Sequence, residues 1–391
     1  MSHRSFMALA LVVTGALAAT TVSTPAAFAE EETQAPNVAA GAAQGPQASS
    51  NEAQSGDGPQ SGATDEAGDP NPSTTPEGVD DTPVTIIVAL EDGSVGIPWY
   101  HRVFGLSSQT KHETVKDRIE TSVEQAVPGA DVTDVADYTH AFDGFAISVP
   151  ASSLEAIKNT AGVKTAFVER HHKPLVVDGE SAAASVDAVN PALKNGSSLE
   201  MTRANQTTVK GDKQVIEVID TGIEATHPAF SGSMDGVPVR LTQRDVESLV
   251  GKLSHGTSGA YLNSKIPFVF DYADNDANVL PTSTKDLSHG THVAAIAAAN
   301  APDLQGTAPN AQIIVAKVAA DKDGAIPDST VLAALDDAVI LKPDSINLSL
   351  GDDAGMGTEA GTVYAEVYKN LAAAGVTVNA AAGNSYSSAY S

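Results

Sequence analysis

The chain has 391 residues, which exceeds one average domain, and 42% of them are hydrophobic, which is enough for a sizeable core. Its 49 acidic and 22 basic residues give a formal net charge of −27, which argues against nucleic-acid binding because phosphate contacts need a basic surface. The absence of cysteine excludes disulfides, zinc–thiolate sites and a thiol nucleophile.

The N-terminus has the pattern of a secretory signal peptide. One arginine lies in residues 1–4, residues 6–20 are mostly apolar, and A-F-A at 27–29 is a small-x-small cleavage site. A membrane anchor is the alternative, but the apolar run is short and contains polar residues. We therefore expect a secreted or cell-surface protein cleaved after Ala29, and no later segment is apolar and long enough to span a bilayer.

The next stretch predicts a disordered leader over residues 30–83. Residues 30–81 contain eleven acidic residues and no lysine or arginine, among glycine, proline, serine, alanine and glutamine. Such a composition has almost nothing apolar to bury, so it stays solvated.

A small α+β unit is predicted for residues 84–170. Apolar alternation and turn signals give a β-α-β-β-α-β order, which is typical of the ferredoxin-like motif. The expected elements are strand 84–90, helix 111–127, strands 132–138 and 145–149, helix 152–160 and strand 163–168. A polar linker is expected over residues 171–197.

Residues 198–391 change character. Near-continuous apolar strands alternate with helices, which predicts an α/β fold with a doubly wound parallel sheet. The strands are expected at 214–219, 313–318, 345–350 and 376–381, and the helices at 291–299, 328–340 and 362–374. Functional side chains in such sheets gather at the carboxyl ends of the strands.

Three motifs lie at strand ends or open a helix. V-I-D-T-G at 218–222 places Asp220 where a buried strand meets a turn, and S-H-G-T-H-V-A at 288–294 places His289 at a helix N-terminus. A-A-A-G-N-S at 380–385 places the amide of Asn384 after another strand. A carboxylate, an imidazole and an amide donor are groups that amide hydrolysis uses.

In this chain order the motifs resemble the subtilisin-like serine peptidases, and residues 288–317 look closest to the cell-envelope and C5a-peptidase branch. The resemblance implies that Asp220 orients His289, that His289 acts as base and then acid, and that Asn384 donates to the oxyanion. It also implies that a strand carrying Ser349, Leu350 and Gly351 binds substrate.

The resemblance extends upstream of these motifs. Y-T-H-A-F-D-G-F at 138–145 and the strand at 163–169 look like the inhibitory propeptide of that family. The chain is then a zymogen whose propeptide inhibits it intramolecularly.

The serine motif of the family, G-T-S-M-A-x-P, is absent, so we expect the nucleophile beyond Ser391 and the chain to be an inactive, incomplete precursor. G-T-S at 256–258 precedes His289, the wrong order, so Ser258 is interpreted as a loop serine. The i, i+3 spacing of His289 and His292 lacks a zincin glutamate, and residues 300–307 are shorter than a calcium loop, so no metal or cofactor is predicted.

The leading interpretation is a secreted subtilisin-like serine endopeptidase acting on protein or peptide substrates. One alternative is a non-catalytic pseudopeptidase that binds peptides at the surface. A second is a secreted inhibitor in which residues 84–170 are the working part, but it leaves Asp220, His289 and Asn384 unexplained.

Overall fold

The computed structural model describes residues 82–91, 106–174, 199, 203–281, 288–351 and 355–383. The predicted signal peptide lies outside the described residues, as does nearly all of the predicted leader. Among the described helices, none has both the length and the hydrophobicity needed to cross a bilayer.

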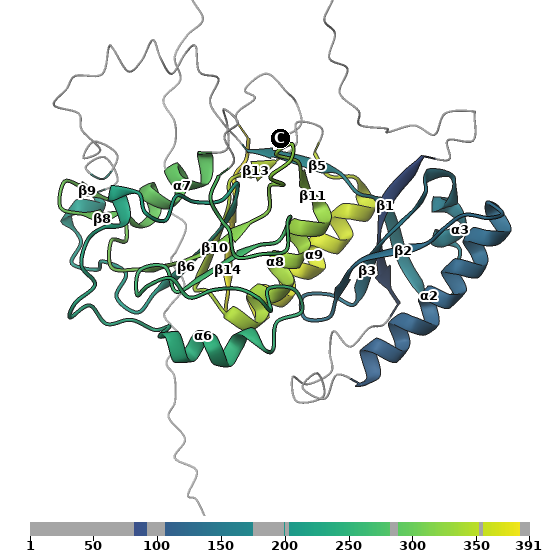
Figure 1. The fold of residues 1–391 in the computed structure, drawn as a ribbon, viewed down its shortest axis with the longest axis horizontal. Helices are drawn as coiled ribbons and strands as arrows, with labels where there is room; N and C mark the ends of the chain where they lie inside the picture. Colours follow the sequence, from purple (N-terminus) through teal and green to yellow (C-terminus); the bar gives the residue numbers. More distant parts are fainter. Residues whose placement is uncertain are drawn as a thin grey trace, which may run out of the picture. The chain divides into compact units, whose positions relative to one another are not determined.

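The N-terminal unit is a four-stranded antiparallel sheet with strand order β2-β3-β1-β4. Two helical segments connect the strands in the order β-α-β-β-α-β (Figure 1). The elements are β1 (Pro83–Leu90), α2 (Leu106–Ala126), β2 (Thr133–Tyr138), β3 (Gly144–Pro150), η1 (Ala151–Ser153), α3 (Leu154–Lys158) and β4 (Val163–Val168).

One face of this sheet is covered by α2. Val115, Ile119 and Val123 follow the i, i+4 spacing of a helix stripe, and all three are buried against β1, β3 and β4. The helix begins at residue 106, five residues before the predicted start. The predicted helix at 152–160 is instead a 3₁₀ turn followed by a short α-helix.

The second sheet has five parallel strands in the order β14-β12-β6-β10-β7. Helices connect consecutive strands, as a doubly wound sheet requires (Figure 1). The elements are β6 (Val215–Asp220), β7 (Phe268–Asp271), α7 (His289–Ala298), β10 (Gln312–Lys317), α8 (Asp328–Leu341), β12 (Ser345–Leu348), α9 (Thr358–Ala373) and β14 (Thr377–Ala380).

The helices lie on both faces of the parallel sheet. Alternate residues of β6 divide between two clusters: Val218 packs with Ala294 and Ala298 of α7, whereas Val215 and Ile219 belong to the cluster that includes α8 and α9. Smaller elements around this sheet are η2 (Ala204–Gln206), η3 (Pro228–Phe230), α6 (Gln243–Val250), β8 (Asn300–Ala301) and β9 (Leu304–Gln305).

Helices α8 and α9 pack on two sheets at once. The cluster that contains Leu332 of α8 and Val367 of α9 also contains Ile87, Ala146 and Phe167 from the four-stranded sheet. That sheet is therefore sandwiched between α2 on one face and α8 and α9 on the other.

Other differences from the sequence expectations concern strands. The first four residues of the predicted linker form β5 (His171–Pro174), the middle strand of a three-stranded sheet with β11 (Ile326–Pro327) and β13 (Leu350–Gly351). The edge strand β7 was not predicted, because four residues after Pro267 are too few to show a period.

Candidate functional site

Asp220 is the last residue of β6, which lies in the middle of the parallel sheet between β12 and β10. Its side chain is 1% exposed, and its Oδ1 accepts a hydrogen bond from the backbone N–H of Thr221 at 2.7 Å. A strand buried on both faces therefore delivers one carboxylate to the carboxyl edge of the sheet.

His289 is the first residue of α7 and lies directly against this carboxylate. Its Nδ1 is 2.9 Å from Oδ1 and 3.1 Å from Oδ2 of Asp220, and its side chain is 9% exposed. An ionised carboxylate only accepts hydrogen bonds, so in the neutral imidazole Nδ1 carries the hydrogen and Nε2 has the lone pair. This is the tautomer in which an imidazole can accept a proton from a nucleophile.

Two glycines allow β6 and α7 to approach closely enough for this contact. A Cβ on Gly290 would lie 2.3 Å from the carbonyl oxygen of Gly222 and 3.1 Å from Asp220 Oδ1. Gly222 itself has φ +99°, in the region that side chains rarely adopt. The neighbouring His292 is exposed on α7.

A buried lysine stands beside Asp220 on the next strand. Lys317 pairs in register with Asp220, and its ammonium forms ion pairs with Asp271, Asp274 and Asp321. Burial opposes its charge, but the hydrogen bonds and charges of Asp271 and Asp321 raise the pKa of Lys317. The three carboxylates lie close enough to share a cation, and the lysine supplies that positive charge.

Strand β5 lies between β11 and β13 and pairs with both. On one side His172 pairs with Ile326 of β11, and on the other Lys173 pairs with Gly351 of β13, both antiparallel. Of the predicted substrate-binding residues, Leu350 and Gly351 form β13, and Ser349 precedes it.

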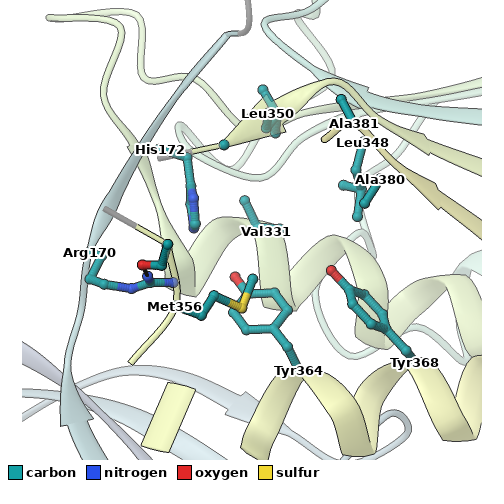
Figure 2. Close-up of a pocket in the computed structure, with 12 residues that line it drawn as sticks. Arg170, His172, Val331, Leu348, Leu350, Met356, Tyr364, Tyr368, Ala380 and Ala381 are labelled. Carbon is teal, nitrogen blue, oxygen red and sulfur yellow. Dashed lines mark hydrogen bonds between the residues drawn. The ribbon is translucent and has the colours of Figure 1, made fainter. Parts of the chain in front are cut away.

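Next to β5 is a cavity of about 270 Å³. Figure 2 shows the His172 ring pointing from β5 into it, with Tyr364 and Tyr368 reaching in from α9. The lining comprises Arg170, His172, Val331, Leu348, Leu350, Gly351, Gly355, Met356, Tyr364, Tyr368, Ala380 and Ala381.

Of the remaining sequence candidates, Asn384 lies outside the described residues. Ser258 is exposed in a turn whose neighbours Ser254, His255 and Gly256 donate backbone hydrogen bonds to Asp337 of α8.

Sequence reasoning missed the polar partner of the cavity. Asp328, the first residue of α8, is fully buried and accepts a hydrogen bond from His172 at 2.6 Å and from Tyr364 at 2.7 Å. In the sequence Asp328 follows a proline at a helix start, which marks it only as a residue favourable to the helix dipole. Nothing local links it to a histidine 156 residues away.

Comparison with known proteins gives one family match and several similar proteins. Residues 211–391 match the family model described as "Subtilase family". The chain is 34% identical over 256 residues to the PI-type proteinase of Lactococcus lactis subsp. cremoris, covering 63% of this chain and 12% of that protein. It is 30% identical over 319 residues to the PII-type proteinase of Lacticaseibacillus paracasei, covering 78% and 16%.

A C5a peptidase of Streptococcus pyogenes serotype M3 is 31% identical over 153 residues, covering 37% of this chain and 12% of that protein. The chain thus spans between 12% and 16% of the length of these relatives. The similarity to the cell-envelope and C5a-peptidase branch is confirmed, and residues 211–391 match the subtilase family of subtilisin-like peptidases.

Proposed function

We propose that this chain is part of a secreted serine endopeptidase precursor that hydrolyses protein or peptide substrates with an Asp–His–Ser triad. The observation that carries the proposal is the buried Asp220–His289 pair, at 2.9 Å, inside the segment that matches the subtilase family. The nucleophile is a serine from beyond the 391 residues, and export follows from the predicted signal peptide.

The proposed mechanism follows from the tautomer that Asp220 imposes. His289 Nε2 takes the proton of the serine hydroxyl as its oxygen attacks the peptide carbonyl carbon, and the negative Asp220 stabilises the imidazolium. His289 then donates that proton to the leaving amine as the C–N bond breaks. Water attacks the acyl-enzyme in the same way, with Asn384 as a donor to the oxyanion in both halves.

The test is to produce the complete reading frame and measure casein hydrolysis. Asp220→Asn should reduce kcat by about 10⁴-fold, because an amide no longer selects the tautomer, and His289→Ala should reduce it at least as much. His292→Ala is the matched control on the exposed side of α7 and should leave kcat unchanged. Full activity in Asp220→Asn would contradict the proposal, and no activity in the unsubstituted protein would favour the peptide-binding pseudopeptidase.

We further propose that the β-α-β-β-α-β unit is a ferredoxin-like inhibitory propeptide. It supplies partners to the N-terminus of α8, where the carboxylate of Glu169 accepts from the Ser329 N–H at 2.8 Å. Lower on the same helix, Asp336 accepts backbone N–H bonds from residues 139–141. The alignment with the PII-type proteinase covers 78% of the chain, more than residues 211–391 provide, so it includes residues upstream of 211.

Inhibition follows from the position of β5. A strand paired on both sides blocks the backbone groups that an extended substrate would use. Residues 83–174, added separately to the mature enzyme, should inhibit competitively, whereas residues 83–169, which lack β5, should inhibit far less at nearly the same melting temperature. Equal inhibition by the two forms would show that β5 does not act as the blocking segment.

A further inference from the structure

The cavity that receives His172 has an uneven distribution of charge. The two basic side chains in its lining, Arg170 and His172, belong to residues 170–174, the segment that ends in β5. The lining contributed by residues 331–381 is uncharged and mostly apolar. Among the described residues, Asp328, the first residue of α8, is the carboxylate that contacts both of these side chains.

Asp328 depends on the β5 segment for most of its hydrogen bonds. Oδ1 accepts from His172 Nε2 at 2.6 Å and from the Tyr364 hydroxyl at 2.7 Å. Oδ2 accepts from the backbone N–H of Arg170 at 2.9 Å and lies 3.4 Å from the Arg170 Nε. Among the described contacts of this carboxylate, only the Tyr364 hydroxyl comes from outside the β5 segment.

A substrate that replaces β5 meets the same carboxylate. Asp328 has no exposed surface, so an apolar side chain in place of His172 would leave a buried charge with one side-chain hydrogen-bond donor. That loss is costly, because a buried charge must be paired or hydrogen-bonded. A glutamate would add a second negative charge to the first.

We propose that Asp328 is a specificity-determining residue, and that this subsite of the cleft selects a histidine or lysine side chain at the substrate position that pairs with Ile326. The inference rests on the proposed function, since it names the substrate class of the same cleft. If the apolar lining residues decided the specificity, the cavity would prefer leucine instead. These residues are Val331, Leu348, Leu350 and Met356.

The experiment uses β5 itself as the occupant and does not require turnover. In the full chain carrying His289→Ala, amide hydrogen exchange of residues 171–173 reports how firmly the strand is held. His172→Leu should accelerate this exchange by roughly 10- to 100-fold, the range expected for losing a hydrogen bond to a charged group. His172→Lys should preserve slow exchange, and His171→Leu, at the exposed neighbour on β5, is the matched control.

A second substitution assigns the effect to the carboxylate. In an Asp328→Asn background, His172→Leu should no longer accelerate the amide exchange of β5. Slow exchange of the β1 amides serves as the check that the fold is intact. Exchange in His172→Leu that equals or is slower than that of the parent, with Asp328 present, would overturn the proposal in favour of an apolar subsite.

Peptide cleavage by the complete enzyme separates this inference from the proposed function. Matched peptides with His, Lys, Leu or Glu at the selected position should be cut with at least a tenfold preference for His and Lys, and Asp328→Asn should abolish it. Cleavage without preference would refute the specificity and leave the peptidase intact. No cleavage, with the exchange result as expected, would refute the peptidase and leave the subsite.

Discussion

Substitution of Asp336 should weaken the contact between helix α8, which carries it, and residues 139–141 of the N-terminal unit. Its carboxylate is fully buried on α8 and accepts backbone N–H bonds from His140 at 2.8 Å and Ala141 at 2.6 Å, and a third from Thr139 at 3.3 Å. His140 Nδ1 lies 3.1 Å from Oδ2. Asp336→Asn keeps the shape but turns an NH₂ group toward donors.

The expected cost is about 3–5 kcal/mol, the range for removing one partner of a buried charged group. Burial alone would raise the pKa of Asp336, but the His140 hydrogen bond, the charges of His140 and His255 and the backbone donors together lower it. A lowered pKa contributes stability above the ordinary value of about 3.9, and this stability is lost as the pH falls through the folded-state pKa. The difference between Asp336 and Asp336→Asn should therefore be full at pH 7 and shrink below about pH 4.

Urea unfolding followed by circular dichroism, at pH 7 and at pH 3.5, measures this difference through the transition midpoint. Asp117→Asn, on the exposed face of α2, is the matched control and should stay within about 0.5 kcal/mol. A change in Asp336→Asn no larger than the control, or one that grows as the pH falls, would refute the reasoning.

Four further substitutions test other parts of the structure. Gly290→Ala places a methyl 2.3 Å from a backbone oxygen and should abolish the low-field Nδ1–H resonance of His289, whereas Gly361→Ala, with nothing within 4 Å, should stabilise α9 by about 0.5–1 kcal/mol. Burial alone would lower the pKa of His112, but the hydrogen bonds that the ring donates to Asp137 and Asp143 outweigh it and raise the pKa to about 9. The N-terminal unit should therefore lose about 3 kcal/mol between pH 6.5 and 9, and His112→Gln should remove this pH dependence in thermal melts. Glu217 is buried with neither oxygen hydrogen-bonded, so Glu217→Met should stabilise the chain by about 1–3 kcal/mol in urea unfolding, and destabilisation would indicate a missing partner.

The pair Asp220–His289 could be predicted because each residue sits in a local signal, a strand end or a helix start, that parallel-sheet topology brings to one edge. The same reasoning identified β6, β10, β12 and β14 to within two residues. Strands β6 and β10 are buried between helices on both faces of the sheet, so each is a near-continuous apolar run that can be recognised from its own residues.

The partners of α8 could not be predicted in this way. Asp336 and Asp337 interrupt an apolar helix, and a sequence shows only that two charges are present. Whether they face water or a buried loop is decided by residues 139–141 and 254–256, which no periodicity connects to the helix. β5 escaped notice for a related reason, since its pairing is with strands about 150–180 residues later.

The same arrangement bears on how fast the chain folds. The three buried aspartates of α8 are satisfied by backbone groups 195, 158 and 81 residues away in the sequence. Each contact closes a long loop before it gains a hydrogen bond, and such high contact order slows folding. Helix α8 cannot desolvate its carboxylates until the loop at 139–141, β5 and the turn at 254–256 have all arrived. We expect its amides to acquire protection late, after those of α2 and of β1, β3 and β4, the strands that complete the α2 stripe within their own unit.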